Sequence, residues 1–451
     1  MATTTACTQS SYSEHVNPKW VELLDLLGMN TRYVRCCGSE LFTAEGTRIL
    51  DFLSGYGVYG IGHNHPRVIA ALKEELDSCG PSMLQSDVPE AAGQLAARLC
   101  SLSGGRLNKV FFPNSGSEGI ETVIKFCRAQ TRRSGMLHAD GSFHGMTCGA
   151  LSLMGGDFWR EGFGPLLPDA ESVPFGNLPA LEEKLRTRRF AGFVIEPVQA
   201  ESGVLVPDRA HLRGAQELCR RYGTLFVLDE VQTGLHRTGP FLAAHHYGLD
   251  PDMVVLAKAL SGGLVPVAAV LMTNEICDTV YGTLERAFVH NSTFSENSLA
   301  MRAGLAVLDV LEQERLGERA AAAGELLRRR LRETLAGFEM VQEIRGAGLL
   351  CAIAFQPPKQ LRLRIPFTAF AKIHPGMFGQ VVVMRLFREY GVLAQICGHN
   401  YLALKLAPPL VIEDAQIEEF VAKMTQLVQF MHSSNSFWSE ALRLAGRAVH
   451  I

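Results

Sequence analysis

Lys258 lies at the end of a buried apolar run, where a lysine side chain is unusual. Lys258 comes just after Val254–Leu256, an apolar run with β-strand character, and small residues and glycines follow it. A charged ammonium at the end of a buried strand is unfavourable unless its charge is lost or used. A lysine amine that has become neutral is a nucleophile and forms Schiff bases with carbonyl compounds. The alternative is a lysine whose stem is buried and whose charged end reaches water.

A second stretch is suited to holding a phosphate group. Residues 112–118 (Phe-Pro-Asn-Ser-Gly-Ser-Glu) have the pattern of a strand end, a tight turn and a helix start. Free backbone N–H groups and the helix dipole favour an anion at such a place, so Ser115, Gly116 and Ser117 could form a phosphate cup. The Gly-Lys-Ser/Thr ending of a Walker A loop is absent. Two alternatives stay open: an ordinary capped helix, and a near match to the nucleophile elbow of hydrolases, with Ser117 as the nucleophile.

A carboxylate ends another apolar run. Asp229 follows Leu225–Leu228, and the carboxyl end of a parallel strand faces the crevice in which α/β sheets bind ligands. Opposite a pyridine nitrogen, Asp229 would keep that nitrogen protonated. Gln232 lies one short turn later and could hydrogen-bond a ring hydroxyl. The pair Asp229-Glu230 could instead hold Mg²⁺, as strand-end carboxylates do in ATPases.

A glycine-bounded aromatic pair, Phe143-His144, completes the set. An aromatic ring can stack on a flat heterocycle, so Phe143 could lie against one face of a cofactor, or it could simply belong to the core. Elsewhere His63 and His65 lack further residues at metal-ligand spacing, which favours a turn at the start of a helix. No metal site is therefore expected.

These motifs need a framework of strands and helices to position them. Between residues 110 and 335 strand patterns alternate with helix patterns, which indicates an α/β domain with a mostly parallel sheet. The C-terminal part mixes both patterns and indicates a smaller α+β unit. The predicted strands are 110–112, 193–195, 225–228, 253–256, 349–355 and 401–406; the predicted helices are 19–27, 66–78, 118–131, 211–222, 297–313, 316–335, 381–390 and 413–432. A meander is expected at 35–52, and the amphipathic tail 436–449 is expected to dock on the body.

Composition narrows the class of protein. A chain of 451 residues is too long for one simple core. With 43 Lys+Arg against 46 Asp+Glu, it has no charge excess suited to nucleic acid or an anionic membrane surface. Eleven scattered cysteines without a CxxC pair, no visible signal peptide and no membrane-length apolar run together predict a cytoplasmic protein.

In combination, these motifs resemble the class III (ornithine aminotransferase-like) family of pyridoxal-phosphate enzymes of fold type I. The resemblance covers about residues 40–412 and is closest from Glu196-Pro197 to Asp229 and on to Gly239. It implies a large cofactor-binding domain at residues 63–315. It also implies a smaller α+β domain built from both chain ends, the segments 1–62 and 316–451.

The resemblance also implies roles for single residues. Lys258 would be the Schiff-base lysine and Asp229 the partner of the pyridine nitrogen, and Gly116-Ser117 would hold the phosphate. It further implies a homodimer in which Thr293, within His290–Phe294, touches the other subunit's phosphate. The remaining cofactor-binding residues implied are Ser115, Phe143, His144, Glu196 and Gln232.

Two positions depart from the family pattern where a substrate carboxylate is usually bound by arginine. Lys405 replaces the arginine that precedes Ala-Pro-Pro-Leu, and Met146 follows the aromatic-x-Gly turn. An ammonium cannot offer the planar fork of a guanidinium. We therefore expect Glu201 to pair with Lys405, and the donor to be an amine, a diamine or an ω-amino group in a pocket that includes Tyr56. Alternatively, Lys405 replaces the arginine and binds the same carboxylate, and the enzyme would then be an ornithine- or acylornithine-type δ-aminotransferase.

The expected reaction is transfer of the amino group to or from a 2-oxo acid or aldehyde in a ping-pong cycle. Other pyridoxal-phosphate chemistry on the same scaffold, a lyase or a racemase, is a second possibility. A serine hydrolase that uses Ser117 and a distant histidine such as His290 is a third, but it leaves Lys258 and Asp229 without a role.

Overall fold

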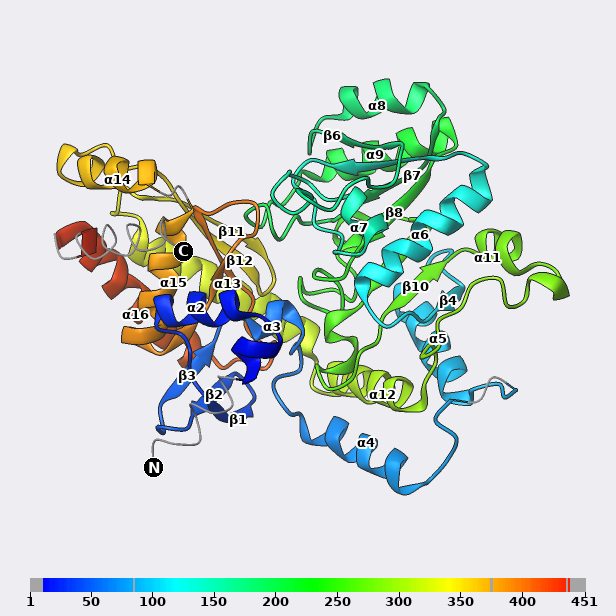
Figure 1. Ribbon diagram of the computed structural model, residues 1–451, viewed down its shortest axis with the longest axis horizontal. Helices are drawn as coiled ribbons and strands as arrows, with labels where there is room; N and C mark the ends of the chain where they lie inside the picture. Colours follow the sequence, from blue (N-terminus) through cyan, green and yellow to red (C-terminus); the bar gives the residue numbers. More distant parts are fainter. Residues whose placement is uncertain (1–10, 84–85, 374–375, 435–436, 439–451) are drawn as a thin grey trace.

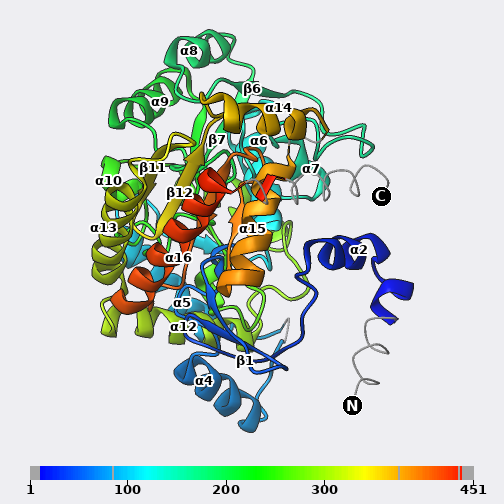
Figure 2. The same cartoon turned by 90° about the vertical axis from the view of Figure 1, so that its left-hand side faces the viewer.

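The computed structural model describes residues 11–83, 86–373, 376–434 and 437–438. Figure 1 shows a large α/β part around α6–α9 on one side of the molecule. The first strands and the C-terminal helices α13–α16 lie together on the other side, as Figure 2 shows from that side. The α/β fold class with a second, smaller part is therefore confirmed, whereas the domain boundaries stay a prediction.

Within the described residues, seven strands form the central sheet of the large part, in the order β4-β10-β9-β8-β7-β5-β6. The strands from β9 to β6 run parallel, and β10 is antiparallel to both of its neighbours. The sheet is thus mostly parallel, as predicted, with an antiparallel strand inserted near one edge. The strands are β4 (Lys109–Phe111), β5 (Gly135–Ala139), β6 (Ala170–Val173), β7 (Phe190–Ile195), β8 (Leu225–Asp229), β9 (Met253–Leu256) and β10 (Ala269–Met272).

Apolar side chains on both faces of this sheet explain why its strands are continuous hydrophobic runs. Val227 and Val255 pack on one face under α6, α7 and α11, while Phe226 and Val254 pack on the other under α5, α8, α9 and α12. The helices of the large part are α4 (Pro66–Asp77), α5 (Glu90–Ser103), α6 (Gly116–Thr131), α7 (Cys148–Ser152), α8 (Leu178–Arg186), α9 (Arg209–Tyr222), α10 (Ala244–Tyr247), α11 (Asn274–Tyr281) and α12 (Ser298–Gln313).

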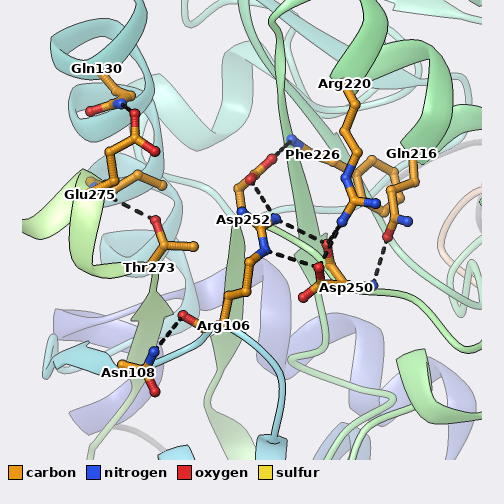
Figure 3. A network of polar contacts seen from close by, with 11 residues as sticks. Arg106, Asn108, Gln130, Gln216, Arg220, Phe226, Asp250, Asp252, Thr273 and Glu275 are labelled. Atoms are coloured by element: carbon orange, nitrogen blue, oxygen red, sulfur yellow. Dashed lines mark hydrogen bonds and ion pairs between the residues drawn. The ribbon is translucent and has the colours of Figure 1, made fainter.

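A charged network fixes the amino ends of β8 and β9 (Figure 3). Asp252 accepts hydrogen bonds from the Phe226 backbone N–H (2.8 Å) and from Arg106 (3.0 Å). Asp250 accepts from Arg106 (2.9 Å) and from Arg220 (2.7 Å) on α9. These bonds tie two neighbouring strands and a covering helix together at the edge of the sheet opposite Asp229.

The chain ends meet in the smaller part. In the described chain, β3 (Arg48–Asp51) of the N-terminal meander pairs in parallel with β13 (Val392–Leu393), so residues more than 300 positions apart share one sheet. Further elements there are β1 (Tyr33–Cys37), β2 (Glu40–Thr43), β11 (Val341–Ala347), β12 (Leu350–Phe355), β14 (Gln395–Ile396), β15 (Ala403–Leu406), α2 (Pro18–Leu27), α3 (Ser54–Gly57), α13 (Leu316–Leu335), α14 (Leu361–Ile373), α15 (Met377–Tyr390) and α16 (Asp414–Ser433).

Most predicted elements are present with ends shifted by a few residues. The strands and α-helices that were not predicted are β5, β6, β10, β11, β13, β14, α3, α5, α7, α8, α10, α11 and α14. Of the predicted tail, Phe437 is buried, and the rest from residue 439 onward lies outside the described residues. Within the described ranges, no helix is long and apolar enough to cross a membrane.

Candidate active site

Lys258 lies at the carboxyl edge of the central sheet. The buried strand β9 ends at Leu256, and Lys258 opens the short 3-10 helix η1 (Lys258–Ser261) with a left-handed φ of 46°. Non-glycine residues seldom adopt this conformation, and where they do it often marks a functional site. Burial lowers the pKa of the Lys258 amine, although the carboxylates of Asp229 and Glu201 act in the opposite direction. The neutral, nucleophilic form of the amine is thereby favoured.

Asp229 lies beside Lys258 because their strands are neighbours. It ends β8, which runs parallel to β9, and it is 4% exposed. Its Oδ2 lies 2.7 Å from Nδ1 of the buried His144, and its Oδ1 accepts the Val231 backbone N–H at 3.0 Å. Burial disfavours a charged His144 ring, but the hydrogen bond and the charge of Asp229 outweigh it and raise the pKa of His144. The carboxylate is therefore held in one orientation by a partner that tends to be cationic.

The N-terminus of α6 faces the same cavity. Ser115 is the N-cap, and its Oγ accepts the Glu118 backbone N–H at 3.2 Å. Ser117 Oγ accepts the Met146 backbone N–H at 3.3 Å. Gly116 is closely packed, because a Cβ there would lie 3.0 Å from Val231. The turn thus combines the free N–H groups of a helix start with a tight backbone approach, as an anion site requires.

Phe143 and Glu196 form one wall. Glu196 follows β7 and accepts the Phe143 backbone N–H at 2.9 Å. Burial, together with the nearby Asp229 charge, raises the pKa of Glu196 to about 7, although His144 opposes the shift. Phe143 is half-buried and contacts the Trp159 ring edge to face, with centroids 5.7 Å apart. Phe143 is thus a cavity wall rather than a core residue.

These groups surround one cavity of about 380 Å³. Ser115, Gly116, Ser117, Phe143, His144, Glu196, Asp229, Gln232 and Lys258 line it, and all of these were predicted as site residues. Val231, Val58, Gly145 and the loop 263–267 line it too and were not predicted. Val231 follows Asp229 by two residues, so an apolar residue just beyond a strand-end carboxylate is the signal that could have found it.

A second cluster lies around Glu201. Lys405, fully buried on β15, forms an ion pair with Glu201 Oε1, as expected from the sequence. Glu201 also accepts hydrogen bonds from Gln232 (3.0 Å) and from the Gly398 backbone N–H (2.9 Å). Burial alone would raise the pKa of Glu201, but the Lys405 cation holds it well below its ordinary value. Lys405 Nζ also lies 5.2 Å from the centroid of the Tyr56 ring.

Tyr56 is presented by an unusual turn. Ser54, Gly55, Tyr56 and Gly57 all have positive φ, which amounts to one left-handed turn. Asp51 holds this turn by accepting the Ser54 backbone N–H at 2.7 Å. Because left-handed backbone is unfavourable for tyrosine, the surrounding contacts must impose it.

Five predicted site residues do not line this cavity: Tyr56, Glu201 and Lys405, which belong to the second cluster, and Met146 and Thr293. Met146 is 55% exposed, and its backbone N–H donates to Ser117 Oγ in the turn at Ser115–Ser117. Thr293 is exposed and lines a separate hollow of about 1010 Å³. Nearby, Ser292 Oγ is 3.0 Å from Asn114 Nδ2 and so connects this segment to the phosphate turn.

The serine-hydrolase alternative requires a contact between the imidazole of His290 and the hydroxyl of Ser117, and these side chains do not meet. His290 contacts Thr122 and Lys125 on α6, at 3.1 and 2.7 Å, and not Ser117. Burial, assisted by Lys125, lowers the pKa of His290 to about 4. The hydroxyl and the imidazole therefore have different partners.

The side chains considered as metal ligands also have separate partners. Glu230 uses its carboxylate to accept the Ala243 and Ala244 backbone N–H groups at 2.8 and 2.7 Å, away from Asp229. His63 pairs with Asp51, and His65 with Glu314. Among the described residues, no group of three potential ligands is placed to hold a metal ion.

Comparison with known proteins gives consistent matches. The family model described as Aminotransferase class-III matches residues 28–428. Aminotransferase PigE of Serratia is 35% identical over 447 residues, which are 92% of this chain and 52% of that protein, so the chain spans about half the length of this relative. Putrescine aminotransferase of Pectobacterium atrosepticum is 36% identical over 421 residues, 90% of this chain and 85% of that protein.

A solved structure supports the same fold. Ornithine aminotransferase from Toxoplasma gondii, with partial occupancy of pyridoxal phosphate (PLP) at its active site, superimposes with a TM-score of 0.80 at 30% sequence identity. The match covers 89% of this chain and 90% of that chain.

Proposed function

Because the chain belongs to the class-III aminotransferase family, we propose that it transfers the amino group of an amine, a diamine or an ω-amino compound to a 2-oxo acid or aldehyde. The chain is an aminotransferase of PLP fold type I, and its cofactor is pyridoxal 5′-phosphate. The observation that carries the proposed chemistry is the meeting of Lys258, Asp229 and the N-terminus of α6 at one cavity.

The residues present fit this cofactor. The helix start at Ser115–Ser117 suits a phosphate, Asp229 suits a pyridine nitrogen, and the lowered pKa of Lys258 suits attachment to an aldehyde. Phe143 and Val231 supply apolar walls for a flat ring. A Cβ on Gly145 would lie 2.2 Å from Ser117 Oγ, so only glycine lets that turn approach the phosphate end so closely.

Each side chain then has a defined task. When bound, the cofactor supplies an electron sink for the carbanion formed at the substrate carbon. Lys258 Nζ would hold the cofactor, and as a free amine it would move a proton from the substrate carbon to the cofactor, which is the transfer that transamination requires. Asp229, oriented by His144, keeps a negative charge where a protonated ring nitrogen needs it. A ping-pong cycle follows, and parallel double-reciprocal plots at varied donor and acceptor concentrations would test it.

The donor proposal rests on Glu201 and Lys405. A substrate carboxylate could reach the Lys405 ammonium only by displacing Glu201, which would then be a buried carboxylate without its cation. Leaving a buried carboxylate without its cation typically costs about 3–5 kcal/mol, which the new pair between Lys405 and the substrate carboxylate would have to offset. A donor without a carboxylate at this point leaves the pair intact. That difference favours amines and diamines over ornithine.

A direct comparison of donors tests the proposal. With pyruvate or 2-oxoglutarate as acceptor, kcat/KM for putrescine should exceed that for ornithine, and Lys405→Ala should change the ratio. If ornithine is used as fast as the amines and Lys405→Ala leaves its rate unchanged, the donor proposal is wrong. If ornithine is preferred and Lys405→Ala abolishes that preference, Lys405 binds the substrate carboxylate, and the ornithine-type alternative is correct.

We further propose a homodimer in which Thr293 reaches the partner's phosphate site. The segment around Thr293 exposes large apolar side chains: Leu284 is 94%, Phe288 66% and Phe294 61% exposed. Contiguous exposed apolar surface is typical of an interface. Sedimentation equilibrium should give twice the chain mass, and Phe288→Glu should shift the protein to monomers with weaker PLP binding.

We also propose two domain boundaries and a cellular location for the protein. Boundaries near residues 62 and 315 are supported by the separate sheets on either side of them. A cytoplasmic location is supported by free cysteines, such as the buried Cys127 and Cys219. Limited proteolysis and cell fractionation would test these two proposals.

A further inference from the structure

The loop between β14 and β15 contacts two parts of the site. One is the turn that carries Phe143 in the cavity wall, and the other is the cluster around Glu201. Its Gly398 backbone N–H donates to Glu201 Oε2 at 2.9 Å, and the His399 backbone N–H donates to the Glu201 carbonyl at 2.8 Å. The strand that follows, β15, carries Lys405. One loop therefore binds Glu201 of the ion pair through two backbone N–H groups and leads into the strand that carries Lys405.

The His399 side chain crosses to the turn that presents Phe143. Its Nε2 lies 3.2 Å from the Ser142 carbonyl oxygen, to which it must donate. Burial lowers the pKa of His399, so the ring is neutral and has one N–H for this bond. The Gly155 backbone N–H also donates to the same carbonyl, at 2.8 Å.

This bond acts on the peptide unit that precedes Phe143. The carbonyl of that unit, on Ser142, accepts from His399, and its N–H, on Phe143, donates to Glu196 Oε1 at 2.9 Å. Both polar ends of one peptide plane are thus fixed by side chains from distant parts of the chain. Fixing the plane limits the direction in which the Phe143 ring can leave the backbone.

The rings themselves are also in contact. The centroids of Phe143 and His399 are 6.4 Å apart, and Trp159 contacts both, at 5.7 and 6.4 Å. Aromatic groups at these separations attract each other beyond the area that they bury. His399 thus holds Phe143 through both the backbone and the ring.

We propose that His399 is a positioning residue that sets the orientation of Phe143 in the wall of the cofactor cavity. This inference rests on the proposed role of Phe143 against the cofactor. It adds a residue of the smaller part of the molecule to the determinants of PLP affinity, although His399 does not line the cavity described above.

Titration of the apoenzyme with PLP tests the inference. His399→Ala should raise the dissociation constant for PLP about tenfold, since one hydrogen bond and one ring contact are lost. His399→Gln, which keeps a donor, and His399→Phe, which keeps a ring, should each raise it about threefold. His432 is the matched control, because it is half-buried, bonded to the Val428 carbonyl and packed on Phe338. His432→Ala should leave PLP affinity unchanged.

A double-mutant cycle separates positioning from general destabilisation. If His399 acts through Phe143, His399→Ala should weaken PLP binding less than about twofold when Phe143→Leu is already present. An equal loss in both backgrounds, or a lower melting temperature with unchanged PLP affinity, overturns the inference. If Phe143→Leu alone leaves the affinity unchanged, the proposed role of Phe143 fails instead. If Phe143→Leu weakens PLP binding and His399→Ala leaves it unchanged, only the positioning role of His399 is refuted.

Discussion

Replacing Lys405 by methionine should destabilise the folded chain by about 3 kcal/mol, because it leaves Glu201 without its cation. Lys405 is 0% exposed, and the Glu201 side chain is 10% exposed, so water can replace little of the lost interaction. Methionine fills a similar volume with a flexible apolar chain and leaves little cavity. The loss is therefore electrostatic rather than a loss of packing.

The size of the effect follows from what stays bound to Glu201. Removing one partner of a buried ion pair typically costs about 3–5 kcal/mol. Gln232 and the Gly398 N–H still donate to the carboxylate at 3.0 and 2.9 Å, which places the loss at the lower end of that range. Replacing both charged residues, as in Glu201→Gln with Lys405→Met, should recover most of the stability, because no buried charge remains.

The dependence on pH has a definite sign. In the native chain, Lys405 depresses the pKa of Glu201 below its ordinary value of 4.5. The pair therefore contributes stability above that pH and loses it as the pH falls through the depressed folded pKa. In Lys405→Met, burial is no longer opposed by the cation, so the pKa of Glu201 rises. The stability difference between the two proteins should therefore be largest near pH 7 and should narrow in acid.

Urea unfolding of the apoprotein at pH 7 and at pH 4 measures this difference. Lys359→Met is the control, because Lys359 is exposed and its substitution should change stability by less than about 0.5 kcal/mol. The electrostatic reasoning is refuted if Lys405→Met matches the native chain within that margin at pH 7. It is also refuted if the loss is the same at both pH values.

Three further outcomes are expected. Lys258→Ala should lower the transamination rate at least about 100-fold and remove the label fixed by borohydride reduction of the PLP-bound protein, as peptide mapping would show. Gly145→Ala should weaken PLP binding about tenfold in a titration, because φ is +123° and the new Cβ meets Ser117, whereas Gly93→Ala, with open space around it, should not. Lys405→Met should raise the pKa of Lys258 by removing a nearby cation and so move the pH profile of PLP loading to higher pH; Lys405→Arg should not.

The placement of Asp229 beside Lys258 could be predicted because it needs only local information. Each residue follows an apolar run that forms a buried strand, and carboxyl ends of neighbouring parallel strands meet at one edge. The helix start at Ser115 is similarly local, because cap, turn and first helical turn are contiguous in sequence. These positions follow from strand and helix patterns alone.

Other parts of the site depend on chain paths that the sequence does not reveal. The loop 263–267 reaches the cavity because β10 returns antiparallel beside β9, which is a property of strand order and not of strand composition. His399 meets Ser142 across 257 positions. The left-handed turn at Tyr56 is imposed by contacts such as that from Asp51, since tyrosine has no preference for positive φ.

In the proposed mechanism Lys258 must be neutral, whereas Lys405 must be charged. Glu201 influences the charge state of both lysines. Lys258 must become neutral to act as a nucleophile, and burial favours that, but a free carboxylate nearby would favour the ammonium form instead. Lys405 forms the ion pair with Glu201, so much of the field of that carboxylate is compensated before it acts on Lys258. A donor carboxylate that drew Lys405 away would expose Lys258 to the uncompensated charge of Glu201. The proposed selection of the donor at Lys405 and the proposed reactivity of Lys258 are thus coupled through one carboxylate.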